Sequence, residues 1–281
     1  MTSMKRKPRR ALPGALKYVT ASLIALVMLL PFYVLCYVAL NDPSVPLSQG
    51  VFRPLTPTLQ NIVTAWQRAD FGRAIWNTAV ITVGGLVVVV TFSASAGFSI
   101  ARYQTRFNRF WQTTFLCCMM VPAIINTVPL YTIMRAIGGI NQLWSMNLLL
   151  SATRLPFCIF LYTSFVQAMS RDIEEAAIID GCTPFMAFWR ISFPIMKPVT
   201  STVIITSAIV FWNNYNQAVF FLQTKKAYTI PLSIGLFYRE YGADWNLVAA
   251  AALISIIPML ALFLSLQKYF MKGFAAGALK G

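Results

Sequence analysis

Long runs of apolar residues constrain this chain more than any other feature of its sequence. A helix needs about 20 apolar residues to cross a hydrocarbon layer about 30 Å thick. We predict six such crossings, over residues 18–40, 74–101, 110–133, 144–169, 199–222 and 247–267. Because lipid cannot satisfy backbone amides, each crossing is expected to be helical, and the alternating pattern of a membrane barrel is absent. The sequence therefore predicts an all-α membrane protein with six transmembrane helices.

The charged residues are few and unevenly distributed. Only 11% of the chain is charged, against 58% hydrophobic residues and a mean hydropathy of +0.65, which lies outside the range of soluble domains. Of the 23 Lys and Arg residues, fifteen lie before the first, after the second, after the fourth and after the sixth predicted crossing. Since positively charged flanks stay on the cytoplasmic side, both termini are expected in the cytoplasm. The net charge of +15 is interpreted as this orientation signal plus attraction to anionic lipid, not as nucleic-acid binding.

We expect one membrane domain with short additions at both ends. Residues 1–72 are expected to hold a cytoplasmic N-terminus, the first crossing and an outer loop with a short helix at 58–69. The first apolar run is too long for a cleaved signal peptide, so we expect it to be retained. Residues 73–270 would hold the other five crossings, and residues 271–281 a cytoplasmic tail. A second outer loop at 223–246 would also be available to a partner.

Residues able to do chemistry are scarce. The chain has no histidine, the commonest general base, and no Gly-x-x-x-x-Gly-Lys-Ser/Thr loop for ATP. Its five cysteines lack the spacing of metal ligands. The predicted crossings contain no Asp, Glu or His, which an ion-driven carrier would normally place there. We therefore predict no catalytic residue, metal or cofactor in this chain, no enzyme activity, and an energy supply from a partner; an ATPase-independent carrier is the alternative.

Half of the acidic residues lie in one short segment, between Asp172 and Asp180. Asp172 is expected to cap a helix that ends at Gly181. A second short helix is expected after Thr183, with Pro184 at its first position. Its apolar sequence FMAFW would lie in the cytoplasm, where such a patch favours a partner interface. The alternatives are a helix lying on the membrane surface and ordinary packing beneath the bundle.

The spacing in this segment resembles a known family signature. Glu175-Ala176-Ala177, three residues, Gly181, nine residues, Ile191, one residue and then Phe193-Pro194 look like the EAA motif of ATP-binding-cassette (ABC) importer permeases. Phe193 replaces the leucine that is usual in the family. The stretches MVPAIINTVPLYTIM, NQLW and QKYFMKGFAAGALKG resemble the smaller permease subunit of carbohydrate importers, similar to the maltose system.

The resemblance implies a type I ABC importer permease fold in the cytoplasmic membrane of a bacterium or archaeon, and a set of partners. These would be a second related permease, two ABC ATPase subunits that bind ATP and Mg, and an extracytoplasmic solute-binding protein. The loop 170–198 would contain coupling helices seated in a groove of the ATPase. The coupling residues that the resemblance implies are Glu174, Glu175, Ala176, Ala177, Asp180, Gly181, Pro184, Phe185, Phe188 and Pro194.

A pathway for a polar solute needs polar groups inside the bundle. Arg154, near the middle of the fourth crossing, could contact substrate hydroxyls or an anionic group. Alternatively, it could donate to carbonyls freed by a helix break at Pro156, or contact the partner permease. The other candidates are Asn126, between two prolines of the third crossing, and Asn213, Asn214, Tyr215 and Asn216 in the fifth.

Both groups of candidates have a structural alternative. The asparagine amides and the tyrosine ring suit sugar hydroxyls and sugar rings, but hydrogen bonds between helices explain such residues equally well. Prolines around Asn126 can open a cavity or serve structure alone. The expected solute is a sugar or oligosaccharide, with an anionic derivative such as a uronate or a glycerol phosphate ester as the alternative. In the maltose system the larger permease makes most sugar contacts, so this chain is expected to line the path without necessarily choosing the solute.

Overall fold

A computed structural model describes residues 14–44, 54–122, 124–239 and 244–278. Within these ranges the chain is almost entirely helical, and the one β-type contact is an isolated bridge between Asn41 and Pro57. The all-α prediction is therefore confirmed. The cations before residue 14, together with Arg53 and Lys280, lie outside the described residues.

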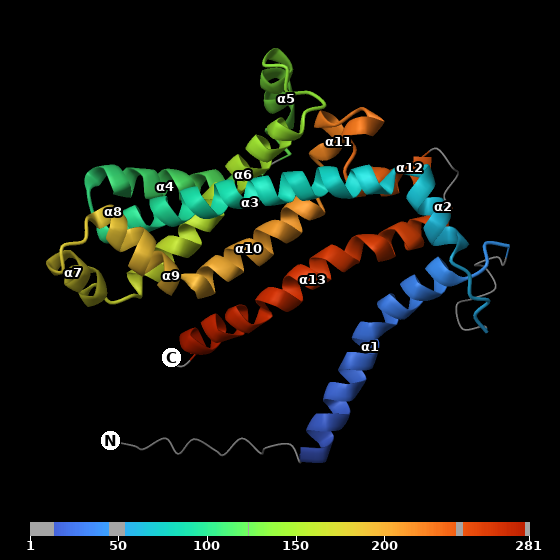
Figure 1. Cartoon of the computed structure of the whole chain (residues 1–281), viewed down its shortest axis with the longest axis horizontal. Coiled ribbons are helices and arrows are strands. Elements are labelled where there is room, and N and C mark those ends of the chain that lie inside the picture. The colour runs from blue at the N-terminus through green and yellow to red at the C-terminus, as the bar shows by residue number, and fades with distance from the viewer. Residues whose placement is uncertain (1–13, 45–53, 123, 240–243, 279–281) are drawn as a thin grey trace, which may run out of the picture.

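Four helices are long and apolar enough to cross a membrane. They are α1 (Gly14–Leu40), α3 (Phe71–Arg102), α6 (Leu143–Gln167) and α13 (Trp245–Ala278). They confirm the first, second, fourth and sixth predicted crossings as helices. In Figure 1, α3 and α6 run along one side of the bundle, α13 lies below them, and α1 leans away from the rest. Residues 16–33 of α1 are accordingly exposed.

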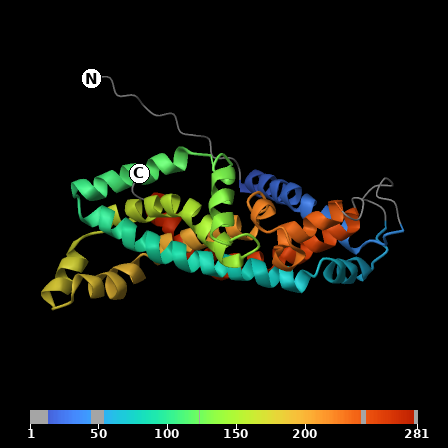
Figure 2. The ribbon, with the colours of Figure 1, turned by 90° about the horizontal axis from the view of Figure 1, so that it is seen from above.

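The prediction of one continuous third crossing over 110–133 was wrong. The structure has α4 (Arg106–Met120) and then α5 (Thr127–Ala136), with a break between them. Val121 adopts an extended conformation, φ −82° and ψ 117°, because the ring of Pro122 disfavours the helical region for the residue before it. Figure 2 shows α5 lying across the bundle, whereas α4 runs alongside it.

The predicted fifth crossing is also interrupted. Helix α10 (Lys197–Trp212) ends at the run of asparagines, and α11 (Ala218–Phe221) follows after a turn. The Asn213 side chain donates to Ile209 O and the Asn214 side chain accepts from Ala218 N, so both compete with the helical hydrogen-bond pattern. The segment Pro184–Ile195 meets α10 at a bend of 74°. If this segment and α10 together form one span, the described residues contain five helices or helix pairs able to cross a membrane. Six crossings remain a prediction.

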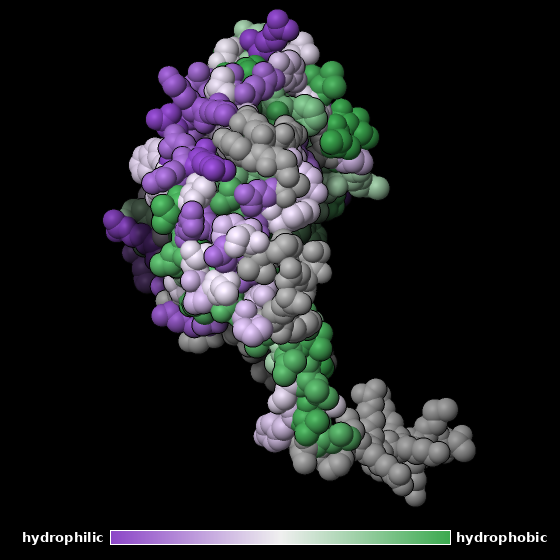
Figure 3. All heavy atoms as spheres, turned by 90° about the vertical axis from the view of Figure 1, so that its right-hand side faces the viewer, coloured by the Kyte–Doolittle hydropathy of each residue, from purple (hydrophilic) through white to green (hydrophobic). Residues whose placement is uncertain are grey.

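The remaining helices are short and lie near the two ends of the bundle. They are α2 (Gln60–Arg68), α7 (Asp172–Ile179), α8 (Pro184–Ala187), a π-helical turn (Phe188–Ser192), α9 (Phe193–Ile195), a 3₁₀ turn (Lys225–Ala227) and α12 (Ile230–Arg239). Helix α2 confirms the short helix expected at 58–69. We call the end that holds α7 and α8 the α7 end, and the opposite end, which holds α2 and α12, the α2 end (Figure 1). Figure 3 looks onto the α2 end, where hydrophilic residues predominate above the apolar surface of α1.

Close approach of helices forms the main core. Buried side chains of α3, α6 and α10 make one cluster, and those of α2, α12 and α13 with the end of α1 make a second. A Cβ atom at Gly85 of α3 would lie 2.7 Å from the Phe211 ring of α10. At Gly84, the same atom would lie 2.8 Å from the Asn147 amide of α6. Gly84 and Gly85 thus permit the close packing of α3 against α6 and α10.

Candidate functional site

Local sequence explains the helix–turn–helix at the α7 end. Gly181 has φ +89°, a conformation that L-residues rarely adopt, and it reverses the chain after α7. Thr183 Oγ1 then accepts a hydrogen bond from Met186 N at 3.3 Å, and Pro184 occupies the first turn of α8. This confirms the predicted pair of short helices. The predicted cap was wrong: Asp172 is the first helical residue, and its own N–H donates to Ser170 Oγ at 3.2 Å.

Nine of the ten predicted coupling residues divide into an exposed set and a buried set, and the tenth, Glu174, is half-buried. The exposed residues are Glu175, Ala176, Asp180, Gly181, Pro184, Phe185 and Pro194. Phe185 is 72% exposed, and Ile179, which no sequence motif indicates, is 85% exposed. Ala177 and Phe188 are buried. Exposed apolar side chains of this size beside a carboxylate are typical of a contact surface for another protein.

Phe188 attaches the segment to the bundle through a cluster of aromatic rings. The Phe188 ring lies 4.9 Å from the Phe98 ring of α3 and 4.8 Å from the Trp189 ring. Phe193 lies 5.1 Å from Trp189 and completes the cluster. Offset and edge-on pairs at these separations are favourable beyond the area they bury. Phe193, where the family usually has leucine, therefore keeps an apolar packing role.

A buried ion pair provides a second attachment. Arg102, the last residue of α3, donates from Nε to Glu174 Oε2 and from Nη2 to Glu174 Oε1, both at 2.8 Å. The two side chains are only 7% and 12% exposed. Arg102 also reaches the carbonyl oxygens of Met169 and Ser170, each at 3.4 Å. The charge pattern indicates Arg102 only as an orientation charge. The signal in the sequence for its pairing is its place one turn after Phe98, at the end of a long helix.

Arg154 lies between α6 and α10 and lacks an acidic partner among the described residues. Its Nε donates to Ser207 Oγ at 3.2 Å, and its guanidinium lies 4.3 Å from the centre of the Phe157 ring. Ser207 also contacts Cys158 Sγ at 3.4 Å. Helix α6 continues through Pro156, so the expected helix break is absent. The guanidinium is half-buried and has donors left for a further ligand.

Asn126 lines a cavity between α4, α5 and α6. The cavity has a volume of about 520 Å³. Thr153 and Pro156 of α6 form part of its wall, while Pro129 belongs to α5. The break between α4 and α5 thus leaves a hollow beside Asn126.

The structure does not bring the four candidates of the WNNYNQ stretch together. Asn213 lines a cavity of about 290 Å³ between α1, α10 and α13, whereas Asn214 holds the first turn of α11. Tyr215 lines a different pocket, and Asn216 is exposed. The amides and the ring therefore do not form a single sugar site within this chain.

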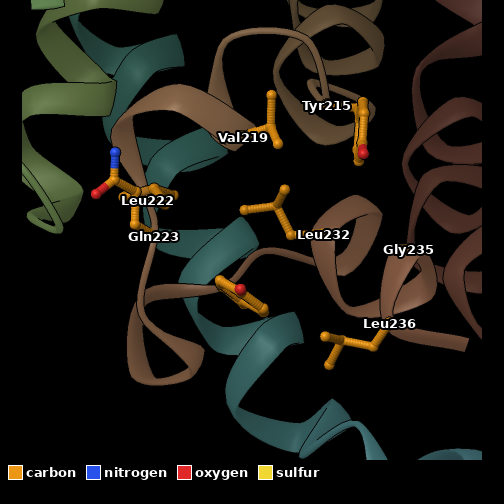
Figure 4. A pocket seen from close by; sticks show the side chains of 8 residues that line it. Tyr215, Val219, Leu222, Gln223, Leu232, Gly235 and Leu236 are labelled. Atoms are coloured by element: carbon orange, nitrogen blue, oxygen red, sulfur yellow. The ribbon is translucent and has the colours of Figure 1, made fainter. Parts of the chain in front are cut away.

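The Tyr215 pocket lies between α11 and α12 and has a volume of about 270 Å³. Figure 4 shows Leu232 projecting into its middle, with Tyr215 on one side and Gln223 on the other. Gln223 and Tyr228, which no sequence motif indicates, contribute polar groups to the wall. Asn141 fixes the chain at residues 223 and 224: its Oδ1 accepts hydrogen bonds from Gln223 N at 2.6 Å and from Thr224 N at 2.9 Å. A lining of two tyrosines, one amide and several aliphatic side chains can hold one sugar unit or one protein side chain.

Comparison with known proteins identifies the family. Residues 92–275 match the family described as binding-protein-dependent transport system inner membrane component. The chain is 34% identical to the melibiose/raffinose/stachyose import permease protein MelC of Bacillus subtilis, over 93% of this chain and 95% of the relative. It is 27% identical to the arabinooligosaccharides transport system permease protein AraQ of Halalkalibacterium halodurans, over 99% and 100% of the two chains.

The fold agrees with this assignment. A crystal structure of a bacterial ABC transporter involved in the import of the acidic polysaccharide alginate superimposes with a TM-score of 0.76. The match covers 96% of this chain and 100% of the other, at 22% sequence identity. The chain belongs to the binding-protein-dependent transport system inner membrane components, the permease family of ABC importers.

Proposed function

We propose that this chain is one permease subunit of an ATP-driven importer for a sugar or oligosaccharide, and that it forms half of the translocation pathway. Membership in a family of binding-protein-dependent transport components supports the import function. Relatives that align over nearly their whole length are named for melibiose, raffinose, stachyose and arabinooligosaccharides. These names favour carbohydrate as the solute class.

The observation that carries the coupling part of the proposal is the structure of the α7–α8 segment. Ile179 and Phe185 are exposed at its tip, while the ion pair of Glu174 and the ring of Phe188 hold its base to α3. An apolar tip on a firmly held base suits insertion into a groove of another protein. We infer that the groove belongs to an ABC ATPase subunit, which binds ATP and Mg. This chain is then a non-catalytic subunit without a cofactor of its own.

The proposal assigns a side of the membrane to each end of the molecule. The α7 end lies in the cytoplasm, where the cation-rich loops after α3 and α6 are expected. Both termini lie on the same side. The α2 end faces outward, where its hydrophilic surface is available to an extracytoplasmic solute-binding protein (Figure 3). A second, related permease completes the pathway beside this chain.

An anionic sugar derivative is the second candidate solute, and Arg154 favours it. The guanidinium is half-buried, Ser207 holds its Nε, and no described carboxylate neutralises it. A guanidinium binds carboxylates, phosphates and sulfonates through paired N–H groups, so an anionic solute is a suitable ligand. A contact with the partner permease is the competing role for Arg154.

The test is purification of the tagged full-length chain in mild detergent, followed by mass spectrometry and an ATPase assay. We expect a second permease and an ABC ATPase to co-purify, and hydrolysis to rise when a solute-loaded binding protein is added. Melibiose, raffinose and stachyose are the first neutral solutes to test, and galacturonate is the first anionic one. Recovery of the chain alone, still transporting after reconstitution into vesicles, would show instead that it is an ATPase-independent carrier.

A further inference from the structure

Helix α3 contacts functional segments at both ends of the molecule. At one end it holds the α7–α8 segment, and at the other it holds the chain between Lys226 and Ile230. We propose that α3 transmits movement between these two segments, with Arg102 and Asn77 as the positioning residues at its ends. The inference rests on the proposed function, which places an ATPase at the α7 end and a binding protein at the α2 end.

The attachment at the α7 end resists separation. Arg102 makes two 2.8 Å hydrogen bonds to Glu174, and both side chains are largely shielded from water. Removing one partner would leave the other charge buried and unpaired, which is strongly unfavourable. Phe98, one turn earlier on the same face of α3, packs against Phe188. Movement of α7–α8 should therefore carry the end of α3 with it.

The attachment at the α2 end is made of hydrogen bonds to backbone. Asn77 is 5% exposed, and its Nδ2 donates to Lys226 O at 3.0 Å and to Tyr228 O at 2.9 Å. The next residue, Thr78, accepts from Ile230 N through its Oγ1 at 2.9 Å. Two adjacent residues of α3 thus hold three backbone groups of the neighbouring segment. Because Tyr228 lines the pocket between α11 and α12, a shift of α3 would reshape that pocket.

Between the two attachments α3 is an unbroken helix. Asn77 and Arg102 are 25 residues apart, which is about 37 Å at 1.5 Å per residue. Each of the other three helices of crossing length contains a proline: Pro31 in α1, Pro156 in α6 and Pro258 in α13. A proline removes a backbone hydrogen bond and favours bending, so α3 is best suited to move as one body. In Figure 1 it runs from beside α8 to beside α2.

The experiment measures how strongly a binding protein stimulates the ATPase of the whole complex in lipid nanodiscs. The stimulation ratio is compared for wild type, Arg102→Met, Asn77→Ala and the double variant. Each single change should lower the ratio by at least about fivefold, the lower end of ordinary coupling between sites. If both residues belong to one connection, the stimulation ratio of the double variant should be no lower than that of the more impaired single variant. Losses that multiply would mean two independent effects and would overturn the proposal.

Two further variants separate transmission from general damage. The double variant Arg102→Glu with Glu174→Arg exchanges the two charges, and it should recover the stimulation that either change alone removes. The same double variant provides the test if Arg102→Met does not assemble. Asn61→Ala is the matched control, because Asn61 is buried and donates to Ala39 O and Asn41 O but lies on α2. An equal loss in Asn61→Ala would refute a special role for α3. Absence of co-purifying ATPase in wild type would instead contradict the proposed function itself.

Discussion

Substitution of Gly181 tests whether the turn between α7 and α8 transmits force. Gly181 has φ +89°, and no atom lies within 4 Å of the position that a Cβ would occupy. The penalty for a side chain therefore comes from the backbone alone and amounts to about 1–2 kcal/mol for alanine. Valine should cost more because its branched Cβ crowds the backbone, and asparagine less because it tolerates the left-handed region.

This penalty translates into a measurable loss of coupling. A change of 1–2 kcal/mol shifts an equilibrium by a factor of about 5–30. We expect each substitution at position 181 to lower the amount of solute imported per ATP hydrolysed. The loss should be smallest for asparagine, up to about 5–30-fold for alanine, and largest for valine. The assay is simultaneous measurement of uptake and hydrolysis in proteoliposomes that contain the whole complex.

Gly138 provides the matched control. It has φ +70° and also has no neighbour within 4 Å of a Cβ position, but it lies in the turn after α5. Gly138→Val should therefore destabilise the chain by a similar amount without uncoupling hydrolysis from uptake. Normal coupling in Gly181→Val, or equal uncoupling in Gly138→Val, would refute the mechanical role of the Gly181 turn.

Three other substitutions test separate parts of the molecule. Arg154→Met should raise KM for an anionic solute by about tenfold or more while assembly is unchanged, since a charged hydrogen bond contributes about 1.5–3 kcal/mol; unchanged uptake kinetics would reduce Arg154 to packing. Phe185→Asp should abolish co-purification of the ATPase yet alter the stability of the isolated chain by less than about 0.5 kcal/mol, measured by thermal unfolding, because Phe185 is 72% exposed. Gly85→Val should lower the free energy of unfolding by about 1–3 kcal/mol, because its Cβ would lie 2.7 Å from the Phe211 ring. Adding Phe211→Leu should recover part of this loss, and unchanged thermal stability in Gly85→Val would contradict the close packing.

Local signals were sufficient where the chain itself determines conformation. Uninterrupted apolar runs predicted α1, α3, α6 and α13 because the length of a crossing is set by the thickness of the bilayer. Gly181 and Pro184 predicted the turn and the start of α8 because their backbone preferences are intrinsic. The third crossing was mispredicted although its signal was present: Pro122 forces the preceding residue out of the helical region.

Relations between distant residues could not be obtained in this way. Hydropathy identifies Arg102 as a charge at a helix end, but its pairing with Glu174, 72 residues later, depends on where α3 and α7 meet. The same holds for Asn77 and the carbonyls of Lys226 and Tyr228. Conversely, neighbours in the sequence such as Asn213 and Tyr215 line different pockets, because the turn after α10 directs successive side chains apart. The sequence by itself determined the four long helices, the turn at Gly181 and the family motif, since these depend on local preferences and spacing. Only the tertiary structure decided which residues share a site, because packing sets the distances between helices.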